Sequence, residues 1–139
     1  MAGSALRNLE TQKVPDNSVV VGYTTETTEL LNHIMFIAPF RCKVEQITFR
    51  YITAPGGNLD IRAARVASGA AETAGTELSS AFAIYSGGDS LNLAVDTNQD
   101  LTITTTENIL DAGESLVIRL SAADTALAGL SVTAFVVPE

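Results

Sequence analysis

The sequence has 139 residues, one cysteine and a formal charge of −8, from sixteen acidic and eight basic side chains. This length is typical of one domain that can bury a sufficient core without disulfides. The acidic balance disfavours nucleic acids and anionic membranes as partners, because both are bound through Lys and Arg. We expect no membrane span and no secretory signal, since neither pattern is found in the sequence. Only 17% of the residues are charged, which predicts that another chain covers part of the surface.

Residues 1–17 are predicted to form a flexible or docking N-terminal arm that precedes a single β-sandwich domain at 18–139. Beyond the first residue, the sizeable apolar side chains of the arm are Leu6, Leu9 and Val14. They do not sustain an amphipathic helix. Such an arm either frays or packs against a neighbour.

Apolar side chains alternate with a period of two along most of the domain, which predicts about eight β-strands. The predicted strands lie at 18–24, 32–38, 41–53, 58–66, 91–95, 101–105, 116–120 and 129–137. Residues 32–38 are apolar on both faces, which predicts a central strand covered on both sides. The number and spacing of the strands predict an all-β fold, an antiparallel β-sandwich.

Two stretches are predicted to be β-hairpins. The turn Ala-Pro-Gly-Gly at 54–57 joins the strand at 41–53 to its partner at 58–66. Residues 109–137 read as one long hairpin with strands on either side of a loop of small polar residues.

Two local irregularities are also predicted. Val44 and Ile47 fall on opposite parities of one strand, so a bulge near 45–46 is needed for both to face the core. Apolar residues recur at helical spacing over 78–85, which predicts a short helix or helical crossover there.

The single histidine and the single cysteine are the first candidates for chemistry. A metal centre with several histidines is excluded within one chain, because His33 stands alone. No nucleophile motif accompanies His33, so we expect a strand-end histidine bonded to backbone. Cys42 lies between Arg41 and Lys43, which could lower its pKa. Alternate residues of a strand face opposite ways, however, so we expect a packed, inert thiol.

Acidic residues gather around the predicted turns. They are Asp89, Asp96, Asp100, Asp111 and Glu114. Carboxylates could bind calcium or form a glycosidase pair, but the sequence has no calcium-loop motif and no Trp to stack on a sugar. Asp is common at turns because it bonds to its own backbone. We therefore predict no catalytic residue, no metal site and no cofactor.

Two further groups of residues have alternative interpretations. The glycine pairs at 56–57 and 87–88 lack the Lys of a phosphate-binding loop, so they are predicted to be turns. Five bases lie close together in the sequence, namely Arg41, Lys43, Arg50, Arg62 and Arg65. They are either exposed ion pairs with residues such as Glu45 and Asp60, or one basic stripe that fits an acidic partner.

A series of short motifs runs from about residue 36 onward. They are Phe36-Ile37-Ala38-Pro39-Phe40, Val44-x-x-Ile47, Pro55-Gly56-Gly57, Leu59-x-Ile61-Arg62-x-Ala64, Ser68-Gly69-Ala70, Gly75-Thr76-x-Leu78, Leu110-x-Ala112-Gly113-Glu114-x-Leu116 and Leu127-x-Gly129-Leu130-x-Val132-Thr133. In this order they resemble the bacteriophage capsid decoration (cement) proteins. The resemblance implies a jelly-roll-like β-sandwich that is oligomeric on the capsid surface, and no functional residue carries over from it.

We therefore expect a structural virion protein that is not an enzyme, lies on the capsid surface and is made in the host cytoplasm. Its expected partners are the major capsid protein and further copies of itself, for example in a trimer. The alternative is a carbohydrate- or receptor-binding β-sandwich module of a virion or fibre, which requires an aromatic or polar cleft.

Overall fold

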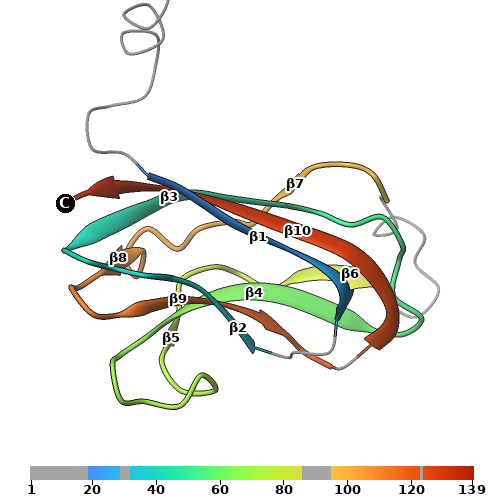
Figure 1. The fold of residues 1–139 in the computed structure, drawn as a ribbon, viewed down its shortest axis with the longest axis horizontal. Helices are drawn as coiled ribbons and strands as arrows, with labels where there is room; N and C mark the ends of the chain where they lie inside the picture. The colour runs from blue at the N-terminus through green and yellow to red at the C-terminus, as the bar shows by residue number, and fades with distance from the viewer. Residues whose placement is uncertain (1–18, 29–31, 86–94, 123) are drawn as a thin grey trace, which may run out of the picture.

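A computed structural model describes residues 19–28, 32–85, 95–122 and 124–139. The described chain contains ten strands and no helix, arranged in two antiparallel sheets of five strands each. The sheets lie face to face as a sandwich (Figure 1). The predicted all-β, antiparallel β-sandwich is confirmed, and the predicted arm at 1–17 lies outside the described residues.

The two sheets are built from strands that are far apart in the sequence. Sheet A contains β1 (Val19–Thr28), β10 (Asp124–Pro138), β3 (Cys42–Arg50), β7 (Gln99–Asp100) and β8 (Ile109–Leu110), the last two both paired with β3. Sheet B contains β2 (Asn32–Ile37), β9 (Ser115–Leu120), β4 (Leu59–Val66), β5 (Thr76–Glu77) and β6 (Phe82–Tyr85), the last two both paired with β4.

The first four strands pair with the later strands in reverse order. β1 pairs with β10, β2 with β9, β3 with β7 and β8, and β4 with β5 and β6. The chain is therefore one long antiparallel ribbon, folded back after β4 and rolled so that neighbouring pairs fall in opposite sheets. This is the topology of a jelly roll, as the resemblance implied.

Both predicted hairpins are wrong. The strands on either side of the 54–57 turn, β3 and β4, belong to different sheets, and so do β9 and β10 of the segment 109–137. Turn residues determine where the chain reverses, but they do not determine whether the next strand stays in the same sheet. Crossing to the other sheet lets the apolar faces of both strands meet across the core.

The predicted helix at 78–85 is also wrong. Leu78 and Ile84 are fully buried, and β6 pairs with β4. The backbone N–H and C=O of Ala63 are satisfied by this segment, through the Ser79 hydroxyl at 2.8 Å and the Leu78 amide at 2.9 Å. Pairing with β4 therefore overrides a weak helical spacing.

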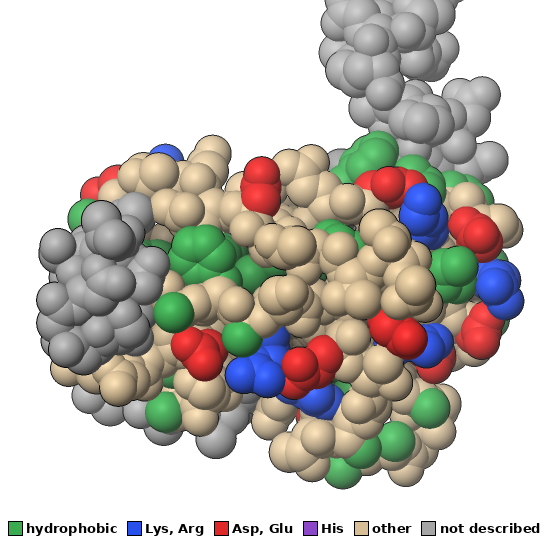
Figure 2. Space-filling model, turned by 180° about the vertical axis from the view of Figure 1, so that it is seen from behind, with side chains coloured by type: hydrophobic (Ala, Val, Ile, Leu, Met, Phe, Trp, Pro, Cys, Tyr) green, Lys and Arg blue, Asp and Glu red, His purple; other side chains and the backbone are tan. Residues whose placement is uncertain are grey.

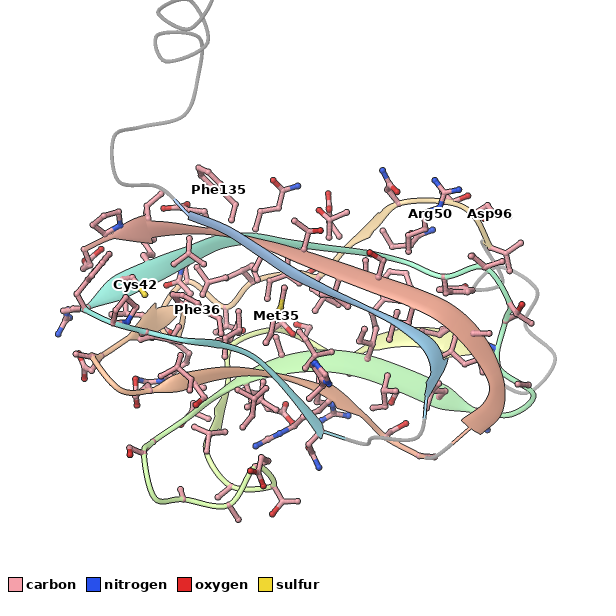
Figure 3. All side chains as sticks on the ribbon, viewed as in Figure 1. Met35, Phe36, Cys42, Arg50, Asp96 and Phe135 are labelled. Carbon is pink, nitrogen blue, oxygen red and sulfur yellow. The ribbon has the colours of Figure 1, made fainter. Side chains whose placement is uncertain are left out.

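Strand β2 is an edge strand of sheet B and is not central as predicted. The pairing with β9 shifts register between Ile34 and Phe36. Met35 and Phe36 consequently both pack against the core, and they lie between the sheets in Figure 3. Ile34 and Ile37 are left 44% and 61% exposed.

The predicted bulge near 45–46 is confirmed. Phe135 lies opposite Gln46, and Val136 lies opposite Val44, so Glu45 is the extra residue of β3. Val44 and Ile47 are both fully buried as a result.

The core fills the space between the sheets. Its largest buried side chains include Ile47, Phe49, Tyr51, Leu59, Ile61, Leu78, Leu116 and Leu130. Phe49 packs edge-on against Phe82, with ring centroids 5.1 Å apart. Leu130, Val132, Ala134 and Val136 of β10 are buried, as the period of two in the sequence predicts, and Phe135 points away from the core (Figure 3). Most of the strand predicted at 91–95 lies outside the described residues, and in place of the strand at 101–105 the structure has β7 and an isolated bridge between Ser79 and Ile103.

Gly75→Ala is expected to lower the free energy of unfolding by roughly 3–5 kcal/mol. Gly75 has a φ of +98°, and a Cβ added there would lie 2.2 Å from the backbone oxygen of Arg65. Gly69→Ala is the control, because Gly69 has a φ of +85° but open space around it, and only the left-handed strain of about 1–2 kcal/mol applies. Urea unfolding measures both, and equal losses would contradict the close approach at Gly75.

Candidate interaction surface

The outer face of sheet B has a hollow beside its edge strand. The hollow measures about 340 Å³ and is lined by Ile34, Ile37, Val66, Ser115, Val117 and Gly113, together with 67–70 and Glu72. We call this feature the sheet B hollow. Its strand residues are mainly branched and apolar, so it is a place where another apolar segment can be buried.

The pairing register explains how the hollow forms. Ile34, Val117 and Ala64 form one row across β2, β9 and β4, and a second row runs from Ile37 through Ser115 to Val66. These rows point away from the core, yet Val117 and Ala64 are fully buried. The segment 67–75 lies against this face and shields them, which leaves the hollow between the segment and β2.

Arg119 holds that segment in place. Its Nε and Nη2 donate to the backbone oxygen of Glu72 at 3.2 and 2.7 Å, and Nη2 also donates to the oxygen of Ala74. Arg119 lies directly opposite Arg62 in β4, and like charges in such a position destabilise a sheet. The carbonyls accept from Arg119, while Glu77 neutralises Arg62 at 2.6 Å. These contacts offset the repulsion between the two guanidinium groups.

The five bases between residues 41 and 65 do not form one stripe. Each pairs with an acid: Arg41 with Asp111 (3.1 Å), Lys43 with Glu45 (3.0 Å), Arg50 with Asp96 (3.2 Å), Arg62 with Glu77 (2.6 Å) and Arg65 with Glu107 (2.9 Å). They come from both sheets, and Figure 2 shows acidic and basic side chains next to one another. The ion-pair interpretation is confirmed, and the basic stripe is wrong.

The outer face of sheet A is polar where β3 meets β7. The Thr48 hydroxyl donates to Asp100 at 2.6 Å, and the Gln46 amide donates to the same carboxylate oxygen at 3.3 Å. Arg50 and Asp96 continue this polar area towards one end of the sandwich (Figure 3). The two sheets therefore present different outer faces, one with a polar network and one with an apolar hollow.

The described acidic side chains of the predicted turns each bind a neighbouring group of the fold. Asp96 and Asp100 are engaged as above, and the backbone N–H of Asp111 donates to the Glu114 carboxylate at 2.8 Å. Asp89 lies outside the described residues. Within the described ranges, no group of three His, Cys, Asp or Glu side chains is placed to hold a metal ion.

The histidine and the cysteine lie on separate strands. His33 is half-buried in β2, opposite Ile118 of β9. Cys42, at the start of β3, is 1% exposed, and burial raises the pKa of its thiol. The packed thiol agrees with the prediction. Tyr51 is fully buried, so it cannot stack on a sugar.

Sequence reasoning missed the sheet B hollow. The sequence shows that β2 is apolar on both faces, but a register shift in the structure turns Ile34 and Ile37 outwards and Met35 and Phe36 inwards. We interpreted two apolar faces as a strand covered on both sides, whereas they belong to an edge strand with one face turned outwards. Arg119 was missed because its partners are backbone oxygens, which no side-chain pattern reveals.

The described residues contain no helix long and apolar enough to cross a membrane.

The chain matches no protein-family model and no curated protein sequence. Among solved structures, a chain of the capsid asymmetric unit of cyanophage Pam1 is 11% identical, with a TM-score of 0.48, and the match covers 88% of this chain and 86% of that one. A chain of infectious bursal disease virus, Gx strain, is 12% identical with a TM-score of 0.33, and 86% of this chain matches 32% of its length. Scores at this level do not establish a shared fold.

Arg119→Ala is expected to release the segment 67–75. Amide hydrogen exchange in that segment should accelerate at least tenfold, and the free energy of unfolding should fall by about 1–2 kcal/mol, because hydrogen bonds from a charged donor are lost. Arg50→Ala is the matched control, since its exposed ion pair contributes less than about 1 kcal/mol. Unchanged exchange in Arg119→Ala would show that other contacts hold the segment.

The Cys42 thiol is expected to resist labelling by a maleimide in the native protein and to react fully in urea. Since burial raises its pKa above the usual value of about 9, the folded state keeps the proton where the unfolded chain loses it. The free energy of unfolding should therefore fall as pH rises above about 8.5. Cys42→Ala isolates this contribution, and identical pH profiles for the two proteins would contradict it.

Proposed function

We propose that this chain is a structural virion protein, a decoration or cement protein that binds the outside of a phage head and stabilises it. The observation that carries the proposal is the difference between the two outer faces. A decoration protein needs one surface that packs on other chains and one that tolerates water, and the sheet B hollow and the polar β3–β7 area are suited to these roles. The jelly-roll topology and the order of motifs after residue 36 support the same function.

The attachment would use side chains that are exposed in the isolated chain. Ile34 and Ile37 are 44% and 61% exposed at the hollow, and Phe40, which follows β2, is 43% exposed. Complete burial of such a side chain contributes roughly 1.5–3 kcal/mol relative to full exposure. One copy would therefore bind weakly through this surface.

Many copies would bind strongly, because attachment of one site raises the effective concentration of the next. We infer that the partners are the major capsid protein and further copies of this chain, with the arm at 1–17 adding contacts. The mechanism is mechanical: each bridging copy adds interface energy that must be overcome before neighbouring capsid subunits separate. The net charge of −8 would keep decorated particles apart in solution.

Purified protein is expected to co-sediment with capsids that lack it, and Ile37→Asp should weaken that binding at least tenfold, because a carboxylate would be buried without a partner. Thr102→Asp is the matched control, since it adds the same charge at an exposed position beside β7. Deletion of residues 1–17 should lower the occupancy while the domain stays folded.

The proposal is overturned if the unchanged protein fails to bind capsids under conditions in which their own decoration protein does. Equal binding of Ile37→Asp and Thr102→Asp would instead remove the sheet B hollow from the contact surface.

A further inference from the structure

We propose that residues 6–9 of the N-terminal arm bind in the sheet B hollow of their own chain. This contact is internal to the free molecule, so it goes beyond the capsid role and can be measured without a capsid. Attachment to a capsid through the same hollow requires the arm to leave it. The described residues leave the hollow open, with Ile37 61% exposed on its β2 side. An exposed apolar hollow in an acidic protein is stabilised when an apolar segment covers it.

The arm joins the sandwich at the end where the hollow lies. Val19 pairs with Val136, which pairs in turn with Val44 near the start of β3. Ile37 ends β2 shortly before that strand, and Gly113, in the wall of the hollow, donates to the oxygen of Ala38 at 2.8 Å. The start of β1, the end of β2 and the 67–75 segment lie at the same end of the sandwich (Figure 1).

The chain between the two sites is long enough. Residues 10–18 separate Leu9 from Val19, and such a segment extends over about 30 Å. The sheets of a sandwich lie only about 10 Å apart, so the arm can pass around the end of the sandwich to the outer face of sheet B. A tether of this length gives an effective concentration on the order of millimolar, which favours the hollow of the same chain over that of another.

The residues of the arm match the lining of the hollow. Leu6 and Leu9 flank Arg7, and the hollow combines branched apolar side chains with one carboxylate, Glu72. Leucines can fill the apolar part while the guanidinium approaches Glu72. No other charged side chain lines the hollow in the part of the chain that the structure describes.

Overall charge also favours the arm as the occupant. Residues 1–18 hold two bases, Arg7 and Lys13, and two acids, Glu10 and Asp16, so their formal charges cancel. The whole net charge of −8 therefore belongs to residues 19–139. A second folded domain that approached the hollow would bring that charge with it, whereas the arm brings none.

A disulfide trap tests the contact. In a Cys42→Ala background, Leu6→Cys and Ala70→Cys place one thiol on the arm and one at the hollow, and copper–phenanthroline with dissolved oxygen oxidises the two thiols to a disulfide. We expect an intrachain disulfide that forms at least tenfold faster than in the matched pair Leu6→Cys and Thr133→Cys. Thr133 is exposed on the outer face of sheet A, so that pair reports random collisions.

Two outcomes would overturn the proposal. Equal rates in the two pairs would mean that the arm has no preferred position. A disulfide that also forms readily when separate Leu6→Cys and Ala70→Cys proteins are mixed would assign the hollow to the arm of a second copy.

Hydrogen exchange of the full chain gives an independent measurement. Leu6→Ser with Leu9→Ser should accelerate exchange at 67–72 and 113–115 by several-fold, whereas Thr11→Ser should change nothing. Unchanged exchange in the double variant would contradict docking. Both measurements are made on the free chain, so failure here does not bear on capsid attachment, in which the arm has left the hollow. Failure to bind capsids likewise does not bear on the contact in the free chain.

Discussion

The fold depends on the pairing of β10 with both β1 and β3. This fifteen-residue strand is central in sheet A, and its inward side chains Leu130, Val132, Ala134 and Val136 cover the core along the whole sandwich. It brings the N-terminal strand and the bulged β3 into one sheet. β2, β9 and β4 are arranged in the same way in the opposite sheet, and the short strands form the edge of each sheet that lies away from β1 and β2.

Buried and partly buried polar contacts, one of them between the sheets, hold the region around β8 together. Arg65 of β4 reaches Glu107 at 2.9 Å and the backbone oxygen of Ile109 at 3.3 Å, so it connects sheet B to β8 of sheet A. Asn108, which is 2% exposed, donates through its side chain to the oxygen of Val44. These contacts satisfy backbone groups that would otherwise be buried without partners where β8 is too short to do so.

Alternation in the sequence was sufficient to predict the all-β class, the inward residues of β10 and the bulge at Glu45, because each depends on the parity of neighbouring residues. It was insufficient to predict which strands pair with one another. The same pattern describes a strand pair that stays in one sheet and a pair that crosses between sheets, so it predicts hairpins for β3–β4 and β9–β10 where the structure has crossings. To predict the hollow, one would need the register of β2, β9 and β4, the position of the segment 67–75 and the backbone contacts of Arg119. None of these follows from the residue pattern alone.

The pairing of Val19 with Val136 has a consequence for synthesis. A ribosome releases β1 long before its neighbour β10 exists, so β1 waits, unpaired, until residues 124–138 have emerged. Folding is therefore dominated by late, non-local closure and should be slow for a protein of this size. During that wait the apolar start of β1 is open to association with other nascent chains.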